Sequence, residues 1–313
     1  MRRRAVERLA AAADAGDRRA WCLAQLAMWR LFHDNRGVLC DPDDLATLQG
    51  LFTASRAWDP PVEGIPFEPD VRRFGEHLAA AVIAASRPTR DPVGRMCAAT
   101  REEWTFLANN MVAEALDFTR VIALASAKLP HRHARLLYHN LYDEAGRGDW
   151  AEAHFALFAD FAAWAGVRVP GFQLADDDVS DVLRWTVPEV VAEINVHDRA
   201  LLQEAPQESL GALFVVEHLV STDFAALVAA LRRLGAPPSA VRYFEVHVEG
   251  DPSHAADWLE LVAPYARTAE EQRLVFAAAV TSARWYARGW DALCDGLDAW
   301  RATGAGPTLP AIS

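Results

Sequence analysis

The sequence predicts an all-α protein, and three observations support that fold class. Alanine and leucine are abundant, and apolar residues return at spacings of three and four along most of the chain. Strand signals are nearly absent, since only Phe244–Glu249 alternates apolar and polar residues. The 313 residues are 52% hydrophobic and 24% charged, which is a globular composition with enough apolar material for a large core.

Residues 1–70 are predicted to form a smaller N-terminal helical domain. Val6–Phe32 has the apolar spacing of one or two helices, and Asp41 followed by Pro42 is a typical helix start. The stretch 58–70 holds four prolines and one glycine, so it interrupts the helical pattern. We therefore place a domain boundary at residue 70.

Residues 71–302 are predicted to form the main helical domain, followed by a frayed tail over 303–313. Pro188 lies inside the fifth predicted helix of this domain and is expected to kink or split it. The predicted helices span 71–86, 99–127, 131–145, 149–165, 178–202, 207–234, 240–262 and 267–301.

Charge and cysteine content argue against several classes of protein. With 31 Lys+Arg against 43 Asp+Glu, the net charge of −12 disfavours nucleic acid and anionic membrane surfaces as partners. The four cysteines form no Cys-x-x-Cys pair, which disfavours a thiolate zinc site and fits a reducing cytoplasm. The basic N-terminus lacks the apolar region of a signal peptide, and the longest run of small apolar residues, 78–85, is too short to span a bilayer.

Two ionisable side chains occupy positions where a core residue is expected. Glu217 has Leu213 and Val220 as its neighbours on the helix face, so its carboxylate points into an apolar stripe. His154 lies one turn from Phe158 and also faces the core. Taken singly, each fits a structural salt bridge or a core histidine, because buried polar groups need partners.

The spacing of His247, Asp251 and His254 is typical of a metal site. On a helix, offsets of four and seven residues return to within about 40° of the starting direction at about 100° per residue. Two imidazoles and a carboxylate suit iron, manganese or zinc. Gly250 and Pro252 interrupt this stretch, so we expect a kinked or marginally stable helix, ordered by the metal, rather than an extended segment.

Glu144 ends a predicted helix beside two glycines and completes the set of candidate ligands. Helical bundles build metal sites from carboxylates and histidines that project inward from several helices. The sequence therefore predicts two metal-sized ligand sets. The candidate ligands are Glu144, His154, Glu217, His247, Asp251 and His254.

The order of these motifs resembles the haem-oxygenase-like di-iron oxidases and oxygenases. The resemblance rests on Asn-Leu-Tyr-Asp-Glu-Ala-Gly-Arg-Gly at 140–148, then His154, then Glu217, then His-x-x-x-Asp-x-x-His at 247–254, and it covers roughly residues 70–265. It implies a seven-helix bundle without haem that binds two Fe(II) ions and uses O2 as co-substrate. It also implies that His154, Glu217 and His254 hold one iron. The other iron would be held by Glu144, His247 and Asp251.

The spacings are more similar to the N-oxygenase branch of that family than to its fatty-acid decarboxylases. Ten residues separate Glu144 from His154, and thirty separate Glu217 from His247. This branch implies oxygenation of an amine-bearing small molecule in natural-product biosynthesis, through a peroxo-di-iron(III) species and with an external electron donor. It also implies a homodimer formed through residues 1–70. Glu114 or Asp117 is left open as an additional ligand.

Three alternatives remain at this point. The same centre is compatible with desaturation or oxidative C–C cleavage of an amino or fatty acid. A metal-free helical module that binds a small molecule would use the six residues as structural polar networks. A related thiaminase-like enzyme would need a cysteine nucleophile at the centre of the bundle, and no cysteine lies between residues 144 and 254.

Overall fold

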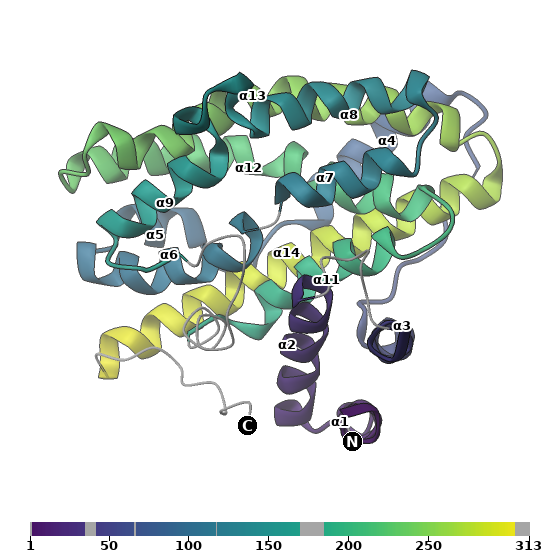
Figure 1. The fold of residues 1–313 in the computed structure, drawn as a ribbon, viewed down its shortest axis with the longest axis horizontal. Helices are drawn as coiled ribbons and strands as arrows, with labels where there is room; N and C mark the ends of the chain where they lie inside the picture. The colour runs from purple at the N-terminus through teal and green to yellow at the C-terminus, as the bar shows by residue number, and fades with distance from the viewer. Residues whose placement is uncertain (1, 35–41, 66, 117, 170–184, 304–313) are drawn as a thin grey trace.

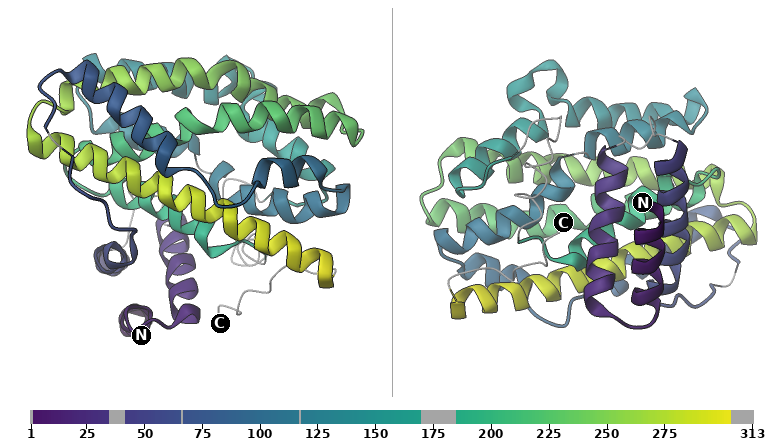
Figure 2. Two further views of the ribbon diagram at one scale, coloured as in Figure 1. Left: turned by 180° about the vertical axis from the view of Figure 1, so that it is seen from behind. Right: turned by 60° about the horizontal axis from the view of Figure 1, so that its bottom comes forward.

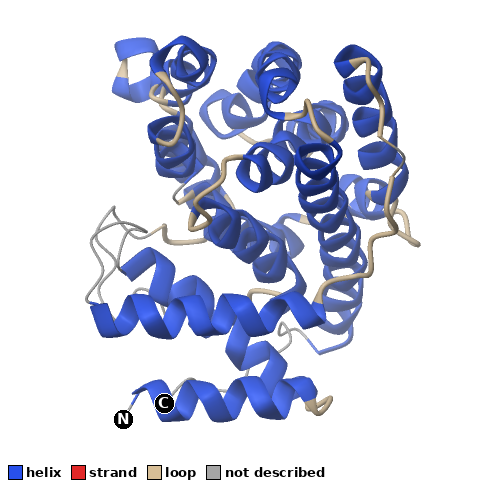
Figure 3. Ribbon diagram, turned by 90° about the vertical axis from the view of Figure 1, so that its right-hand side faces the viewer, coloured by secondary structure: helices blue, strands red, loops and turns tan. Residues whose placement is uncertain are grey.

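The structure is a computed structural model that describes residues 2–34, 42–65, 67–116, 118–169 and 185–303. Within these ranges every regular element is helical, which confirms the all-α prediction (Figure 3). Phe244–Glu249, the segment with strand-like alternation, lies inside a helix. Tertiary packing thus overrides its local pattern.

Three helices precede the main body: α1 (Arg2–Asp14), α2 (Arg18–Asp34) and α3 (Pro42–Ser55). They lie together on one side of the molecule (Figure 2). Trp21 of α2 stacks on Trp285 near the C-terminus, with ring centroids 5.6 Å apart. Leu26 and Trp29 join the main hydrophobic core. The domain boundary at residue 70 and a role in dimerisation stay predictions, and Asp41 lies outside the described residues.

The main body begins with α4, which Asp70 caps by accepting hydrogen bonds from the backbone N–H groups of Arg72 and Arg73. Figure 1 shows the order of the helices. They are α4 (Val71–Ala85), α5 (Pro92–Ala98), α6 (Arg101–Ala115), α7 (Phe118–Ala127), α8 (His131–Glu144), α9 (His154–Trp164), α11 (Pro188–Leu201), α12 (Gln207–Arg233), α13 (Pro238–Val262) and α14 (Ala269–Thr303). Short 3-10 turns lie at η1 (Arg56–Trp58), η2 (Gly146–Gly148), η3 (Trp150–Glu152) and η4 (Ala263–Tyr265).

Two predicted helices are corrected by the structure. The predicted helix 99–127 is two helices, α6 and α7, and α6 begins at a capping box between Thr100 and Glu103. The described part of the predicted helix 178–202 is α11, which begins at Pro188, because proline lacks the N–H of a helix interior but fits the first helical position. Residues 178–184 and 304–313 lie outside the described residues.

Helices α12, α13 and α14 are the framework on which the site is built. α12 packs along both α13 and α14 (Figure 1). Gly211 permits the close approach of α14, since a Cβ there would lie 2.1 Å from the backbone oxygen of Val275. Among the described helices, α12 alone is long and apolar enough to cross a membrane by length and composition. In the fold its apolar residues Leu213, Phe214 and Val215 are core.

Candidate metal centre

A cavity of about 110 Å³ lies between α6, α9, α11, α12, α13 and α14, and the end of α8 reaches it. Its walls are largely apolar, yet carboxylates gather in it. None of the described residues that line it is a lysine or an arginine. The ionisable side chains on its wall are Glu114, Glu144, His154, Glu193, Glu217, His247, Asp251 and Tyr286, together with Tyr243.

Three of the predicted ligands form one cluster, which we call the turn triad: Glu144, His154 and His247. Their ligand atoms lie within 4.8 Å of one another. Nδ1 of His154 is 2.9 Å from Oε1 of Glu144, and the two imidazole rings are 4.4 Å apart between centroids. Two imidazoles and one carboxylate make up the donor set that non-haem Fe(II) sites favour.

The turn triad depends on the tight connection between α8 and α9. Glu144 is the last residue of α8, and His154 is the first residue of α9. Gly146 adopts a φ of +76°, and a Cβ at this position would lie 2.4 Å from the backbone nitrogen of Ala153. Only glycine therefore allows the turn to fold back onto the start of α9.

The other three predicted ligands form a second cluster, the helical triad: Glu217 of α12 with Asp251 and His254 of α13. Their ligand atoms also lie within 4.8 Å of one another. Nδ1 of His254 is 3.3 Å from Oε2 of Glu217 and 3.9 Å from Oδ1 of Asp251. The exposed fractions are 3%, 2% and 0%, so the helical triad is enclosed.

The two clusters differ from the grouping that the family resemblance implied, and which three residues hold each iron stays a prediction. His154 belongs with Glu144 rather than with Glu217, because the glycine turn brings it back to the end of α8. Asp251 belongs with His254 rather than with His247. Along the axis of α13 the rise from Asp251 is about 4.5 Å to His254 and about 6 Å to His247. Residues 247–254 are helical rather than extended, since α13 continues through Pro252, while the kink and the ordering by a metal stay predictions.

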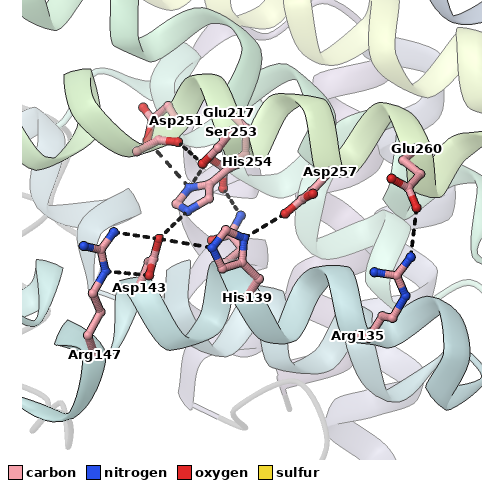
Figure 4. Close-up of polar contacts among 12 residues, drawn as sticks. Arg135, His139, Asp143, Arg147, Glu217, Asp251, Ser253, His254, Asp257 and Glu260 are labelled. Carbon is pink, nitrogen blue, oxygen red and sulfur yellow. Dashed lines mark hydrogen bonds and ion pairs between the residues drawn. The ribbon is translucent and has the colours of Figure 1, made fainter.

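Asp143 fixes the orientation of His254, as Figure 4 shows. Oδ2 of Asp143 is 3.1 Å from Nε2 of His254, and Arg147 donates two hydrogen bonds of 2.7 and 3.0 Å to the same carboxylate. The hydrogen bonds from Arg147 are the main reason that the pKa of Asp143 falls to about 2. An ionised Asp143 only accepts, so Nε2 of His254 donates and Nδ1 faces the helical triad.

Two further contacts position ligand atoms. Nδ2 of Asn140 donates a 2.5 Å hydrogen bond to Oε1 of Glu217. Nδ1 of His247 donates a 2.6 Å hydrogen bond to the backbone oxygen of Tyr243. A carbonyl can only accept, so Nε2 of His247 is left to face the turn triad.

The two triads place three carboxylates close together in a buried site, and this shifts the pKa values of their members. Burial, with the charges of Glu217 and Glu144, raises the pKa of Asp251 to about 10. Burial and the charge of nearby His154 lower the pKa of His247 to about 4. Burial opposes protonation of His254, but the hydrogen bonds and charges of Glu217, Asp143 and Glu144 raise its pKa to about 9. A metal would replace the protons that such crowded carboxylates otherwise need.

The residues present fit a pair of metal ions. Nδ1 of His154, Oδ1 of Asp251 and Nδ1 of His254 are buried, and apart from the contacts within the triads they have no hydrogen-bond partner among the described residues. Buried polar atoms without partners are costly, and metal coordination is one way to satisfy them. The mixed nitrogen and oxygen donors suit iron or manganese better than a thiolate-selective metal.

Sequence reasoning missed several residues of this site. Asp143 and Asn140 lie inside the 140–148 motif, but their roles in positioning ligands were not predicted. In the structure His139 contacts Asp257 at 2.9 Å and lies 3.9 Å from Asp143 (Figure 4). The sequence signal that could have identified Asp143 is its four-residue spacing from His139, which places both side chains on one face of α8. Glu193 was also missed.

Of the two open candidates for an additional ligand, Glu114 lines the cavity. Burial and the charge of Glu217 raise the pKa of Glu114 to about 7. Asp117 lies outside the described residues.

Comparisons with known proteins agree on fold and family. Similar solved structures include a CADD-like protein of unknown function from Nostoc punctiforme, with a TM-score of 0.54 and 17% identity over 72% of this chain and 97% of that one. They also include a domain of unknown function with a heme oxygenase-like fold from Shewanella denitrificans, with a TM-score of 0.56 and 18% identity over 75% of this chain and 96% of that one. At these identities they establish the haem-oxygenase-like fold alone.

No curated protein matches the sequence. The model of a family described as iron-containing redox enzymes matches residues 105–287, which include all six candidate ligands. That match spans more than half of the chain. The chain therefore belongs to the family of iron-containing redox enzymes.

Proposed function

We propose that this protein is a non-haem di-iron oxygenase that transfers oxygen to the nitrogen of an amine-bearing small molecule in natural-product biosynthesis. The observation that supports it is the presence of two triads at one cavity, with three carboxylates and three imidazoles. Two ferrous ions carry four positive charges, which offset the three carboxylates of the triads. Without cations, this many buried acids are unfavourable.

Two irons held by the triads would supply O2 activation and two-electron oxidation. The overall reaction inserts one oxygen atom into an N–H bond, which gives a hydroxylamine, and releases the other oxygen as water. An external donor must provide two electrons and two protons for this balance. Membership of an iron-containing redox family supports an oxidoreductase, and the spacings of the motif support the N-oxygenase branch.

The residues of the chain contribute binding, orientation and exclusion of water. Asp143 and Asn140 hold His254 and Glu217 in place before any metal binds. Phe155 and Phe224 form part of the apolar wall beside the triads. An apolar wall disfavours the charged form of an amine, so it keeps the nitrogen lone pair free for reaction.

The test is product analysis with labelled oxygen. The Fe(II)-loaded protein is mixed with 18O2, a reductant and each of three probes: 1,4-diaminobutane, L-lysine and L-arginine. We expect a hydroxylamine that carries one labelled oxygen on nitrogen, detected by mass spectrometry. An alkene or a shortened carbon chain would replace the proposal with desaturation or C–C cleavage. A protein that binds no iron and consumes no O2 would favour a metal-free binding module.

A further inference from the structure

Glu193 of α11 is a buried carboxylate that neither triad uses. Its side chain lines the cavity, it is 7% exposed, and its Oε1 is buried without a hydrogen-bond partner within the described structure. Nε2 of His197, one turn later on α11, lies 3.9 Å from Oε1 of Glu193. That nitrogen is 2.9 Å from the hydroxyl of Ser282, and burial lowers the pKa of His197 to about 3, so it is neutral. Among the residues that the structure describes, no lysine or arginine forms an ion pair with Glu193.

Glu193 is carried by α11, whereas the helical triad is carried by α12 and α13. Its pKa is raised well above the usual range, first by burial and then by the charge of Glu114. Glu114 in turn interacts with Glu217 of the helical triad. Tyr286 of α14 also interacts with Glu193. Glu193 is thus part of the same cavity wall but belongs to neither triad of candidate ligands.

The charges of the cavity leave Glu193 without a counter-ion even when metals are bound. Two divalent ions are balanced by Glu144, Glu217 and Asp251 together with Glu114. The described lining holds no lysine or arginine that could neutralise a further carboxylate. A buried carboxylate is retained at a cost unless a cation meets it. In a substrate cavity the remaining source of that cation is the substrate.

We propose that Glu193 binds a cationic nitrogen, an ammonium or guanidinium group, of the substrate. This inference rests on the proposed function and specifies its substrate class as molecules with two nitrogen groups. One nitrogen stays charged and is held by Glu193, and the other, uncharged, lies at the metal pair. A diamine or a basic amino acid has this chemistry. A charged hydrogen bond of this kind also fixes which nitrogen reaches the metals.

The test compares diamines with amino alcohols on the anaerobic, Fe(II)-loaded protein. Linear diamines of three to six carbons and amino alcohols of the same lengths are titrated by calorimetry. We expect the wild type to bind its best diamine about tenfold to a hundredfold more tightly than the matching amino alcohol. Glu193→Gln keeps the side-chain shape and should lose that preference. Glu189→Gln on the same helix should keep it, because Glu189 pairs with Arg18 and is absent from the cavity lining.

Several outcomes would overturn the inference. One is a wild type that binds no diamine of the series more tightly than its amino alcohol. Another is a Glu193→Gln variant that keeps the preference for diamines. A third is a Glu193→Gln variant that loses its iron, which would assign Glu193 to the metal centre instead. Iron content and O2 consumption are measured on the same samples. A protein that binds iron and consumes O2 but shows no preference for diamines contradicts only the proposed role of Glu193. A protein without iron contradicts the proposed function, while the diamine preference still decides the role of Glu193.

Discussion

The two triads differ in how the fold holds them. The helical triad is carried by long helices, α12 and α13, and neighbouring side chains fix its Glu217 and His254. The turn triad joins the end of α8, the start of α9 and α13 through a glycine turn. It faces the cavity with all three of its side chains, whereas His254 of the helical triad lies behind the wall. The helical triad is thus held by side chains around two long helices, and the turn triad by the glycine turn and by the hydrogen bond from His247 to Tyr243.

This difference suggests a division of labour. A site fixed by surrounding hydrogen bonds binds metal with little rearrangement. A site at a turn and a helix start can change the position of its carboxylate, which is useful where O2 and substrate must enter. We therefore expect the first iron to bind the helical triad and the second to bind the turn triad.

The largest effect is expected for His254→Ala. It removes a ligand and the buried partner of Asp143 and Glu217, which leaves carboxylates without a counter-charge. We expect loss of iron from the helical triad and a loss of about 3–5 kcal/mol in the unfolding free energy of the metal-free protein. Metal analysis and urea unfolding measure the two effects. His139→Ala is the matched control, because His139 is exposed, and full iron loss there would contradict the assignment.

Gly146→Ala should separate the two triads. A Cβ at this position collides with the backbone of Ala153, so the turn must open and Glu144 must move away from His154. We expect about one iron per chain, held by the helical triad, with helical content retained in circular dichroism. Gly148→Ala is the control: its φ of +95° is also positive but no atom lies within 4 Å of the added Cβ. It should cost about 1 kcal/mol of stability and keep both irons. Equal iron loss in both variants would argue against the turn as the determinant.

Asp143→Asn should weaken the helical triad without removing a ligand. The amide no longer holds His254 as a charged acceptor, so we expect iron affinity to fall about 10- to 100-fold. Anaerobic Fe(II) titration measures this change. Asp257→Asn, which loses only the contact with His139, should leave affinity within about twofold of the wild type. A fully retained affinity in Asp143→Asn would show that His254 needs no such support.

The sequence identified all six clustered residues, because helical periodicity reports which face a side chain occupies. His247, Asp251 and His254 share a face of α13 whatever that helix packs against. Their division into two triads was beyond sequence reasoning, since it depends on how the turn at Gly146 places His154. That the six residues bind iron stays a prediction.

The same limit explains what was missed. Asp143 and Glu193 matter through partners on other helices, α13 and α6, so their roles depend on tertiary packing. Glu193 lies on α11, which begins at Pro188, and its side chain lines the cavity. An all-helical fold, in contrast, follows from composition and spacing, and this part of the prediction is confirmed.

A smaller effect is expected from pH. In the metal-free protein the pKa values of Asp251, Glu114 and His254 are raised, to about 10, 7 and 9. Groups with raised pKa values stabilise the fold when protonated, and this contribution is lost as pH rises through the folded-state values. We expect the melting temperature of the metal-free protein to fall between pH 6.5 and 9. Fe(II) affinity should rise by up to about tenfold per pH unit, because the metal displaces protons.

Thermal unfolding across this range, with and without Fe(II), measures the first effect, and anaerobic titration measures the second. The lowered pKa of His247 acts only below pH 6.5, so it does not interfere in this window. A metal-free protein whose stability rises with pH would show that the carboxylates of the triads are not crowded as described.

The most direct test of a di-iron centre is anaerobic Fe(II) titration of the wild type, followed by metal analysis and rapid mixing with O2. We predict two irons per chain, bound in two steps, and a transient visible absorption band that requires both. Gly146→Ala should stop after the first step and lack the band. A folded wild-type protein that binds no iron, or only one, would contradict the account.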